Sequence, residues 1–205
     1  KTQNTLILVL EDFGGESLRD CLKQRAFTLQ EWLALAIAIA DSLGQLHATN
    51  TLHKDLNPSN IIWNPSTQQV KLIDFGIATQ LPRENPVLQS PEQLEGTLAY
   101  LSPEQTGRMN RSLDYRTDLY SLGVTFYELL TEQLPFPTND TMELVHAHIA
   151  KLPQPLYERK LSVPPPLSDI VLKLMAKNAE DRYQSAFGLK KDLEECWAQW
   201  RATGR

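Results

Sequence analysis

The first apolar segment of the chain is a continuous run from Leu6 to Leu10, with no polar position inside it. A short apolar run without alternation is typical of a strand that is buried on both faces. Acidic residues and glycines at 11–15 end this run. The segment from Ser17 to Arg25 then has the pattern of a short helix. The chain is therefore predicted to begin with a buried strand, a turn and a helix.

The longest apolar pattern predicts a helix that begins after Thr28 and ends at 48–50. Thr28 and Glu31 form a capping box, in which each side chain accepts a hydrogen bond from the backbone N–H of the other residue. The apolar positions recur at helical spacing and give one broad face, which we interpret as core. These positions are Leu29, Trp32, Leu33, Leu35, Ala36, Ile39, Leu43 and Leu46.

Two short apolar segments, 61–63 and 70–73, flank turn residues at 64–66 and predict a β-hairpin. From Asp114 onward the chain is predicted to be mostly helical. Asp114 is expected to cap a helix that is apolar nearly all round, which is typical of a buried central helix. Asp118 lies inside this helix, and a buried acid needs hydrogen-bond partners.

The remaining helices are predicted from their periodicity and caps. They cover residues from 139 or 140 to about 150, from 167 to 177, and from a cap at Ser185 to Trp197. Prolines at 153, 155 and 164–166 are interpreted as connectors between helices. The last residues, 201–205, are expected to be frayed.

Composition narrows the class of protein without identifying a function. The chain has 205 residues, enough for one domain with a sizeable core, and 41% of them are hydrophobic. A net charge of −5 gives no reason to expect a nucleic-acid partner. Cys21 and Cys196 match no metal-binding spacing and are interpreted as reduced thiols, which fits a cytoplasmic protein. The longest apolar run, 32–40, is too short to span a membrane.

Candidate chemistry is concentrated between Leu52 and Ile62, where a histidine, an aspartate and an asparagine fall within eight residues. Pro58 disfavours a helix at the residue before it, so this polar run is predicted to be a loop. A second aspartate follows in the segment Ile73 to Gly76, at the end of the predicted hairpin. Taken together and in this order, the two segments resemble the H-R-D-x-x-x-x-N catalytic loop and the D-F-G metal site of eukaryotic-type protein kinases.

This resemblance implies transfer of phosphate from ATP to Ser or Thr of proteins, and the mainly helical (α+β) fold of the large C-terminal lobe of a kinase. Asp55 is then expected to orient the substrate hydroxyl and accept its proton, and Asn60 and Asp74 to bind Mg²⁺. Structural roles are implied for six residues through three sets of contacts. His53 is expected to pack on Phe75, which precedes Gly76. Asp118 is expected to form hydrogen bonds with the backbone at His53 and Lys54. Arg182 is expected to pair with Glu104.

The resemblance also implies an ATP site at the start of the chain. Residues 11–15 correspond to the hinge of the family, with Leu10 as gatekeeper. Backbone groups of Glu11 and Phe13 are expected to hydrogen-bond adenine, and Ile62 is expected to lie under it. By themselves, these residues are also consistent with an ordinary strand followed by a turn.

The segment from Asp74 to Glu104 corresponds to the activation segment. Ser-Pro-Glu-Gln occurs twice, at 90–93 and 102–105. We take the second copy as the counterpart of the A-P-E motif, because residues 96–101 resemble the preceding G-T-x-x-Y of the family. Thr97 is then expected to contact Asp55, and 98–101 to face the substrate residue after the acceptor. These features are more similar to Ser/Thr kinases than to tyrosine kinases.

Two positions depart from the family pattern. Lys54 stands where many members have arginine, and Asn57 stands where Ser/Thr kinases have a lysine that reaches the transferred phosphate. Loss of that cation weakens the stabilisation of charge in the transition state. The candidate catalytic set of Asp55, Asn57 and Thr97 therefore leaves two hypotheses open: an active kinase, or a non-catalytic pseudokinase or scaffold module of a larger signalling protein.

The wider context is also inferred from resemblance. Residues 106–111 are similar to a subgroup of bacterial Ser/Thr kinase domains that begin much larger signalling chains. For Arg108 and Arg111, a solvated basic loop is as consistent with the sequence as a direct binding role. No G-x-G-x-x-G loop and no Val-Ala-x-Lys strand occurs in the sequence. We therefore expect 1–16 to be the last small-lobe strand and the hinge, 17–205 to be the large lobe, and the rest of the small lobe to precede Lys1. Expected partners are this small lobe, further signalling domains and a protein substrate.

Overall fold

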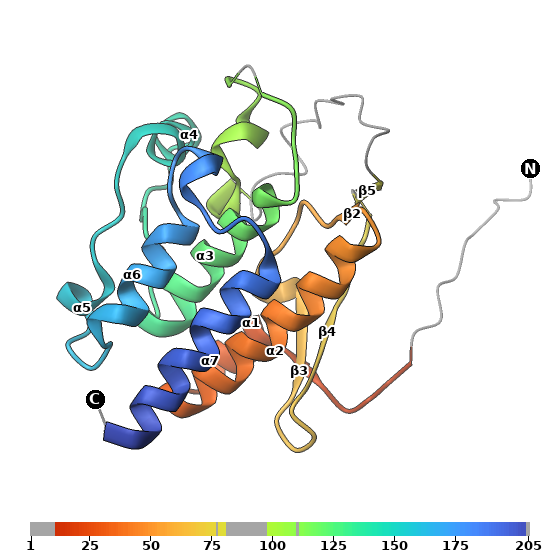
Figure 1. Ribbon diagram of the computed structural model, residues 1–205. Helices are drawn as coiled ribbons and strands as arrows, with labels where there is room; N and C mark the ends of the chain where they lie inside the picture. Colours follow the sequence, from red (N-terminus) through yellow and green to blue (C-terminus); the bar gives the residue numbers. More distant parts are fainter. Residues whose placement is uncertain (1–10, 77, 81–97, 110, 204–205) are drawn as a thin grey trace, which may run out of the picture.

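Residues 11–76, 78–80, 98–109 and 111–203 are described by a computed structural model of the chain. This part is largely helical, with two small antiparallel sheets along one side (Figure 1). The predicted fold class, mainly helical with a small hairpin, is confirmed. The strand predicted over 6–10, with Leu10, lies outside the described residues, and so do Thr97 and the first Ser-Pro-Glu-Gln at 90–93.

The elements have the following bounds. The α-helices are α1 (Leu18–Gln24), α2 (Leu29–Ala48), α3 (Arg116–Thr131), α4 (Thr141–Ala150), α5 (Leu156–Arg159), α6 (Pro165–Leu174) and α7 (Ala186–Thr203). The 3-10 helices are η1 (Pro58–Asn60), η3 (Leu98–Tyr100), η4 (Pro103–Thr106) and η5 (Ala179–Asp181). The strands are β1 (Glu16–Ser17), β2 (Thr51–Leu52), β3 (Ile61–Asn64), β4 (Gln69–Leu72) and β5 (Thr79–Gln80).

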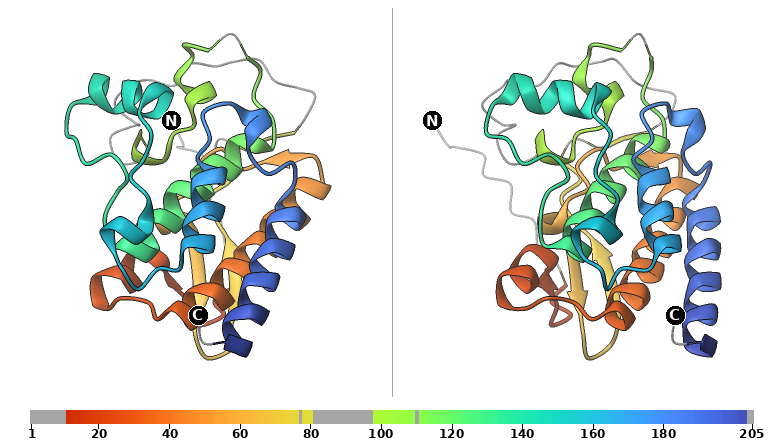
Figure 2. Two further views of the ribbon diagram at one scale, coloured as in Figure 1. Left: turned by 60° about the vertical axis from the view of Figure 1, so that its left-hand side comes forward. Right: turned by 90° about the vertical axis from the view of Figure 1, so that its left-hand side faces the viewer.

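Helix α3 forms the centre of the core, because every residue from 117 to 131 is buried. Trp32 of α2 packs edge-on against Phe126 of α3, with ring centroids 5.1 Å apart. Gly123 allows α6 to approach α3 closely, since a Cβ there would lie 2.7 Å from the Cβ of Leu174. Helices α2 and α7 lie side by side against this core (Figure 2). The prediction of an apolar, buried central helix is confirmed.

Several predicted helix starts are confirmed by their caps. Thr28 and Glu31 make both hydrogen bonds of the capping box at α2. The side chain of Ser17 caps α1, and that of Asp140 caps α4. At α7, the Ser185 hydroxyl accepts a hydrogen bond from the N–H of Gly188 at 3.0 Å.

Other helix bounds differ from the prediction. Helix α3 begins one residue later than a cap at Asp114 would give, although the Asp114 carboxylate still accepts the Arg116 N–H at 2.9 Å. Helix α6 begins at Pro165 and ends at Leu174, so Pro165 and Pro166 belong to its first turn and Pro164 is its N-cap, rather than all three forming a connector. Proline is accepted there because first-turn N–H groups have no partner inside the helix. Helix α7 continues to Thr203, past the predicted end at Trp197.

The two sheets frame the candidate catalytic loop. The predicted hairpin is present as β3 and β4, with Ile61 opposite Leu72, and β1 extends it on the other edge of β3. Strand β2 precedes the loop and pairs with β5, which follows residues 73–76. Sequence patterns missed β1, β2 and β5, because a strand of two residues has no periodicity. The β2–β5 pair joins the segments that carry the two candidate aspartates.

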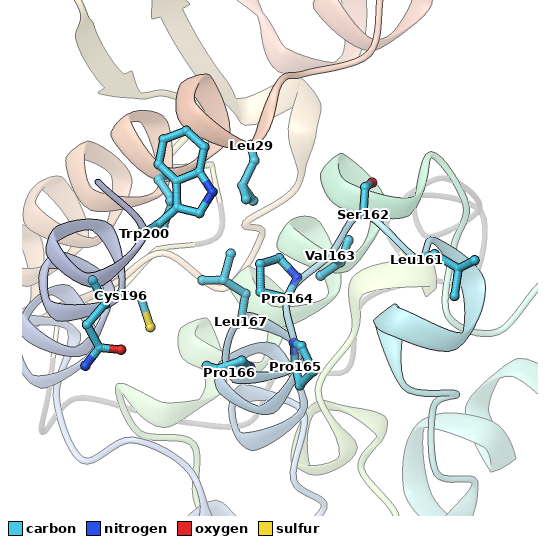
Figure 3. Close-up of a pocket in the computed structure, with 12 residues that line it drawn as sticks. Leu29, Leu161, Ser162, Val163, Pro164, Pro165, Pro166, Leu167, Cys196 and Trp200 are labelled. Carbon is cyan, nitrogen blue, oxygen red and sulfur yellow. The ribbon is translucent and has the colours of Figure 1, made fainter. Parts of the chain in front are cut away.

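A cavity of about 350 Å³ lies between the first turns of α2 and α6 and the end of α7 (Figure 3). Leu29, Leu167 and Trp200 are among its mostly apolar lining residues. None of the candidate catalytic residues lines it. The catalytic loop follows the opposite end of α2, a 20-residue helix about 30 Å long, so this cavity is a separate feature.

Composition also led to predictions about the two cysteines and about membrane-spanning segments. Cys21 and Cys196 are free thiols, Cys21 buried and Cys196 partly exposed. Within the described ranges, no helix combines the length and apolar composition that crossing a membrane requires.

Candidate active site

His53 holds the two candidate loops together. Its imidazole is fully buried and its Nε2 lies 2.9 Å from the carbonyl oxygen of Ile73, the residue before Asp74. Since a carbonyl only accepts, Nε2 carries the hydrogen, and Nδ1 is free to accept the N–H of Asp55 at 3.3 Å. The ring also packs on Phe75, with centroids 5.0 Å apart. The predicted contact with Phe75 is present, and the link to Asp55 is additional.

Two amide side chains hold the carboxylate of Asp55. Asn57 Nδ2 donates to Oδ1 of Asp55 at 3.0 Å, and Asn60 Nδ2 donates to Oδ2 at 3.0 Å. Both amides also donate to the Asp55 carbonyl. The Asn57 oxygen accepts the N–H of Ser59, which caps η1 and fixes the amide. The Asp55 carboxylate is therefore oriented by two neutral groups, a direct role for Asn57 that the sequence did not predict.

Asn60 and Asp74 have oxygen atoms suited to a magnesium ion. The amide nitrogen of Asn60 faces Asp55, which leaves its oxygen with no hydrogen-bond partner in the described part of the chain. Asp74 is exposed, and among the described residues its Oδ1 accepts one hydrogen bond, from the Gly76 N–H at 3.2 Å. The described residues contain no cluster of three or more His, Cys, Asp or Glu arranged to hold a metal. One carboxylate and one amide fit Mg²⁺, which takes its remaining ligands from substrate phosphates and water.

Asp118 fixes the backbone at the start of the catalytic loop. Its buried carboxylate accepts the N–H of His53 at 2.9 Å and that of Lys54 at 2.7 Å, as predicted. Its Oδ2 also lies 2.9 Å from Nε2 of His47, near the end of α2. Lys54 has a positive φ of 68°, which these bonds help to maintain. The sequence did not reveal the role of His47, because one histidine near a helix end carries no specific pattern.

Replacement of Asp118 by asparagine is expected to lower the free energy of unfolding by about 1–3 kcal/mol. An amide presents one oxygen and one NH₂ group, so at least one of the three N–H donors around this side chain would lose its acceptor. Urea unfolding of the chain would measure the change. Asp169→Asn, at an exposed position on α6, is the matched control and should have almost no effect. Equal stability of the two variants would contradict the role of Asp118.

Glu104 and Arg182 form the predicted ion pair. Arg182 Nη1 and Nη2 lie 2.7 and 2.9 Å from the two carboxylate oxygens, and both side chains are almost fully buried. The other guanidinium hydrogens reach the carbonyls of Ala176, Arg116 and Lys177. Burial alone would raise the pKa of Glu104, but bonds and attraction from Arg182 bring it below its usual value of 4.5. This pair ties the segment after 98–101 to the region between α6 and α7.

The expected ATP-contacting residues lie around β1 and β3. The Phe13 carbonyl accepts a hydrogen bond from Asn64 Nδ2 at 2.7 Å, so one of its lone pairs is already used. Ile62 on β3 packs close to Gly15, where a Cβ would lie 2.7 Å from a methyl carbon of Ile62. Lys71 on β4 contacts the Glu11 carboxylate and lies over the Phe13 ring at 4.6 Å. Glu11, Phe13 and Ile62 thus form one region, whereas Leu10 lies outside the described residues.

The sequence did not predict a second polar network, which is formed around Arg19, Tyr100 and Glu128. Arg19 of α1 contacts the Tyr100 hydroxyl and the Glu128 carboxylate, with 2.7 Å between Nη1 and Oε1. Tyr100 donates to Glu128 as well, and burial with the nearby Glu128 charge raises the pKa of Tyr100 well above its usual value. Gln105 donates to the carbonyl of Lys54 at 2.8 Å. These contacts connect 98–105 to the core and to the catalytic loop, and no short motif encodes them.

A mainly helical lobe that presents paired loops of this kind has the architecture of the large lobe of a protein kinase. The family model described as protein kinase domain matches residues 1–194, and the chain belongs to this family.

Relatives agree with this assignment. The chain is 34% identical over 187 residues to the serine/threonine-protein kinase PknB of Mycobacterium leprae, which covers 91% of this chain and 29% of that protein. A probable serine/threonine-protein kinase of Streptomyces coelicolor is 33% identical over 190 residues, covering 92% and 28%. The hybrid signal transduction histidine kinase G of Dictyostelium discoideum is 56% identical over 98 residues, covering 48% of this chain and 3% of that protein. The chain thus spans less than a third of each of these relatives.

Proposed function

We propose that this chain is the catalytic large lobe of an ATP-dependent protein serine/threonine kinase. The observation that carries the proposal is the Asp55 carboxylate, held by Asn57 and Asn60 and linked through His53 to the loop of Asp74. Asp55 orients the substrate hydroxyl and accepts its proton. In phosphoryl transfer the protein mainly supplies positioning and electrostatic stabilisation, which this rigid arrangement suits.

The cofactors proposed are ATP and Mg²⁺. When bound, the metal neutralises charge on the phosphates, and Asn60 and Asp74 are its protein ligands. Ile62 and backbone groups of Glu11 and Phe13 would hold the adenine, with Leu10 as gatekeeper. Residues 1–16 are the last small-lobe strand and the hinge, and 17–205 are the large lobe.

Thr97 and the segment 98–101 are proposed to meet the substrate protein. In this proposal Thr97 would contact Asp55, and 98–101 would lie beside the residue that follows the acceptor Ser or Thr. Support comes from the two relatives named serine/threonine-protein kinases, which match over most of the chain. The similarity to a hybrid signalling kinase supports a role in signal transduction beside further domains.

A non-catalytic pseudokinase or scaffold module is the second candidate. It is favoured by Asn57, which supplies no positive charge where the family has a lysine. The hydrogen bond from Asn57 to Asp55 supports the enzyme instead, because an amide in this contact can orient the carboxylate.

Joining residues 1–205 to the small lobe of a related protein kinase is the direct test. This longer chain is expected to transfer labelled phosphate from ATP to a protein or peptide containing Ser and Thr, with Mg²⁺ present. Phosphoamino-acid analysis of the product identifies the acceptor. A folded chain that binds MgATP but never transfers phosphate would support the pseudokinase instead.

The 205-residue chain by itself is expected to bind ATP weakly and to transfer little or no phosphate. Its sequence has no glycine-rich loop and no Val-Ala-x-Lys strand to cover and hold the nucleotide. Correct placement of reactants accounts for roughly 7–11 kcal/mol of an activation barrier. Without these two elements the chain should place ATP poorly and should therefore be a poor catalyst. Calorimetric titration with MgATP and a radiolabel transfer assay would measure both properties. Micromolar binding with steady turnover would overturn this expectation.

A further inference from the structure

Helix α4 packs on the segment 98–106 through a small buried surface. It contacts η3 and η4, and Ala147 and His148 are its buried residues. His148 is 1% exposed, whereas His146, two positions earlier, is exposed. An imidazole at such a position is unusual, because its two nitrogens need hydrogen-bond partners that an apolar side chain would not.

The hydrogen-bond chain around His148 fixes its tautomer. Lys177 Nζ lies 3.3 Å from the Tyr120 hydroxyl, and a lysine ammonium can only donate. The hydroxyl proton of Tyr120 is then directed to Nδ1 of His148, 3.0 Å away. With Nδ1 as acceptor, Nε2 carries the hydrogen of the neutral ring. The ring is held in addition by edge-on packing on Phe136, with centroids 5.3 Å apart.

The other side of the imidazole faces the segment after Thr97. Burial, and then the charge of Lys177, lower the pKa of His148 to about 4, while the backbone of Leu98 and Ala99 opposes this change. The ring is therefore neutral near pH 7 and lies close to the polar backbone of η3. Its buried Nε2 has no hydrogen-bond partner of ordinary geometry among the described residues. The Nε2–H group thus favours positions of η3 in which a carbonyl is turned toward it.

We propose that His148 is a positioning residue for 98–101, and that it thereby helps to determine which side chain is accepted directly after the phosphorylated Ser or Thr. The inference rests on the proposed function. Tyr120, on the central helix α3, anchors one edge of the ring, and the Nε2–H group on the other edge attracts the backbone carbonyls of η3. Of residues 98–101 only Ala99 is not buried, and its side chain is apolar, so the preferred substrate side chain is apolar too.

Substrate preference tests the proposal in the chain that carries a small lobe. His148→Phe retains the packing on Phe136 but loses both nitrogens. It is expected to raise the KM of a peptide substrate about tenfold and to change the ranking of peptides that differ only after the acceptor, with the KM of ATP unchanged. His148→Gln, which keeps one acceptor and one donor, should retain the ranking of the parent, and so should His146→Ala. An unchanged ranking in His148→Phe would overturn the proposal.

Hydrogen exchange provides a readout that needs no activity. In the 205-residue chain, the amides of 98–101 should exchange faster in His148→Phe than in the parent or in His146→Ala, with α7 as internal reference. If exchange changes in this way but the parent transfers no phosphate, the proposed function fails and the positioning contact stands. If exchange of 98–101 is unaffected, the positioning role of His148 is refuted, whatever the activity.

Discussion

Asp55→Asn is expected to reduce phosphoryl transfer by about 10²–10⁴-fold in the chain joined to a small lobe, the usual contribution of a positioned general base. Asparagine keeps one side-chain oxygen, so it can accept from only one of the Asn57 and Asn60 amides, which both still donate to the carbonyl of residue 55. Its amide cannot accept the proton of the substrate hydroxyl. Transfer of radiolabelled phosphate to a Ser/Thr peptide measures the effect.

Circular dichroism and MgATP titration are the folding controls for this variant. Both should be nearly unchanged, because the core is not altered and the Asn60 amide keeps its hydrogen bond to the carbonyl of residue 55. Asp169→Asn, at an exposed position on α6, should retain full activity. Undiminished turnover in Asp55→Asn would remove the catalytic assignment, since no other carboxylate is proposed as the base.

Loss of either partner of the Glu104–Arg182 pair is expected to cost about 3–5 kcal/mol of the free energy of unfolding. Both charges are buried, so removal of one leaves the other without compensation. Urea unfolding of Glu104→Gln, Arg182→Met and the double variant forms the appropriate cycle. The double variant should lose much less than the sum of the single changes, and strictly additive losses would contradict direct coupling.

A solvent-exposed ion pair is the control for this double-mutant cycle, and the pH dependence of stability is a further test. The exposed pair Lys23–Asp20 should show no measurable coupling in the same experiment. Because the pKa of Glu104 is lowered in the folded state, its contribution to stability is full above its usual pKa of 4.5 and is lost as the pH falls through the folded pKa. Acid should therefore destabilise the parent more than Glu104→Gln.

The sequence predicted the elements whose cause is local. The capping box of Thr28 and Glu31, the apolar stripe of α2 and the hairpin at 61–72 depend on neighbouring residues, and the structure contains all of them. Helix bounds were wrong where proline was interpreted only as a breaker, as at Pro165.

Motifs predicted the candidate site. Its contacts with residues that are distant in the sequence were predicted only in part. Asp118 and Arg182 were expected from resemblance, and their contacts are present. The bonds of Asn57 to Asp55 and of His47 to Asp118 were missed, because a neutral amide or a single histidine has no pattern that identifies its partner. No short pattern identifies the contacts of His148, which packs against Tyr120 and Phe136.

The bonds of Asp118 also have a kinetic consequence. They join α3 to backbone groups 64 and 65 positions earlier in the chain, so a long loop must close before they form. The entropy of that closure is offset only once α3 has docked in the core. The catalytic loop should therefore acquire its conformation late in folding, and variants that slow the docking of α3 should delay the appearance of a competent loop. In pulse-labelling experiments, the amides of His53 and Lys54 would then become protected after those of α2.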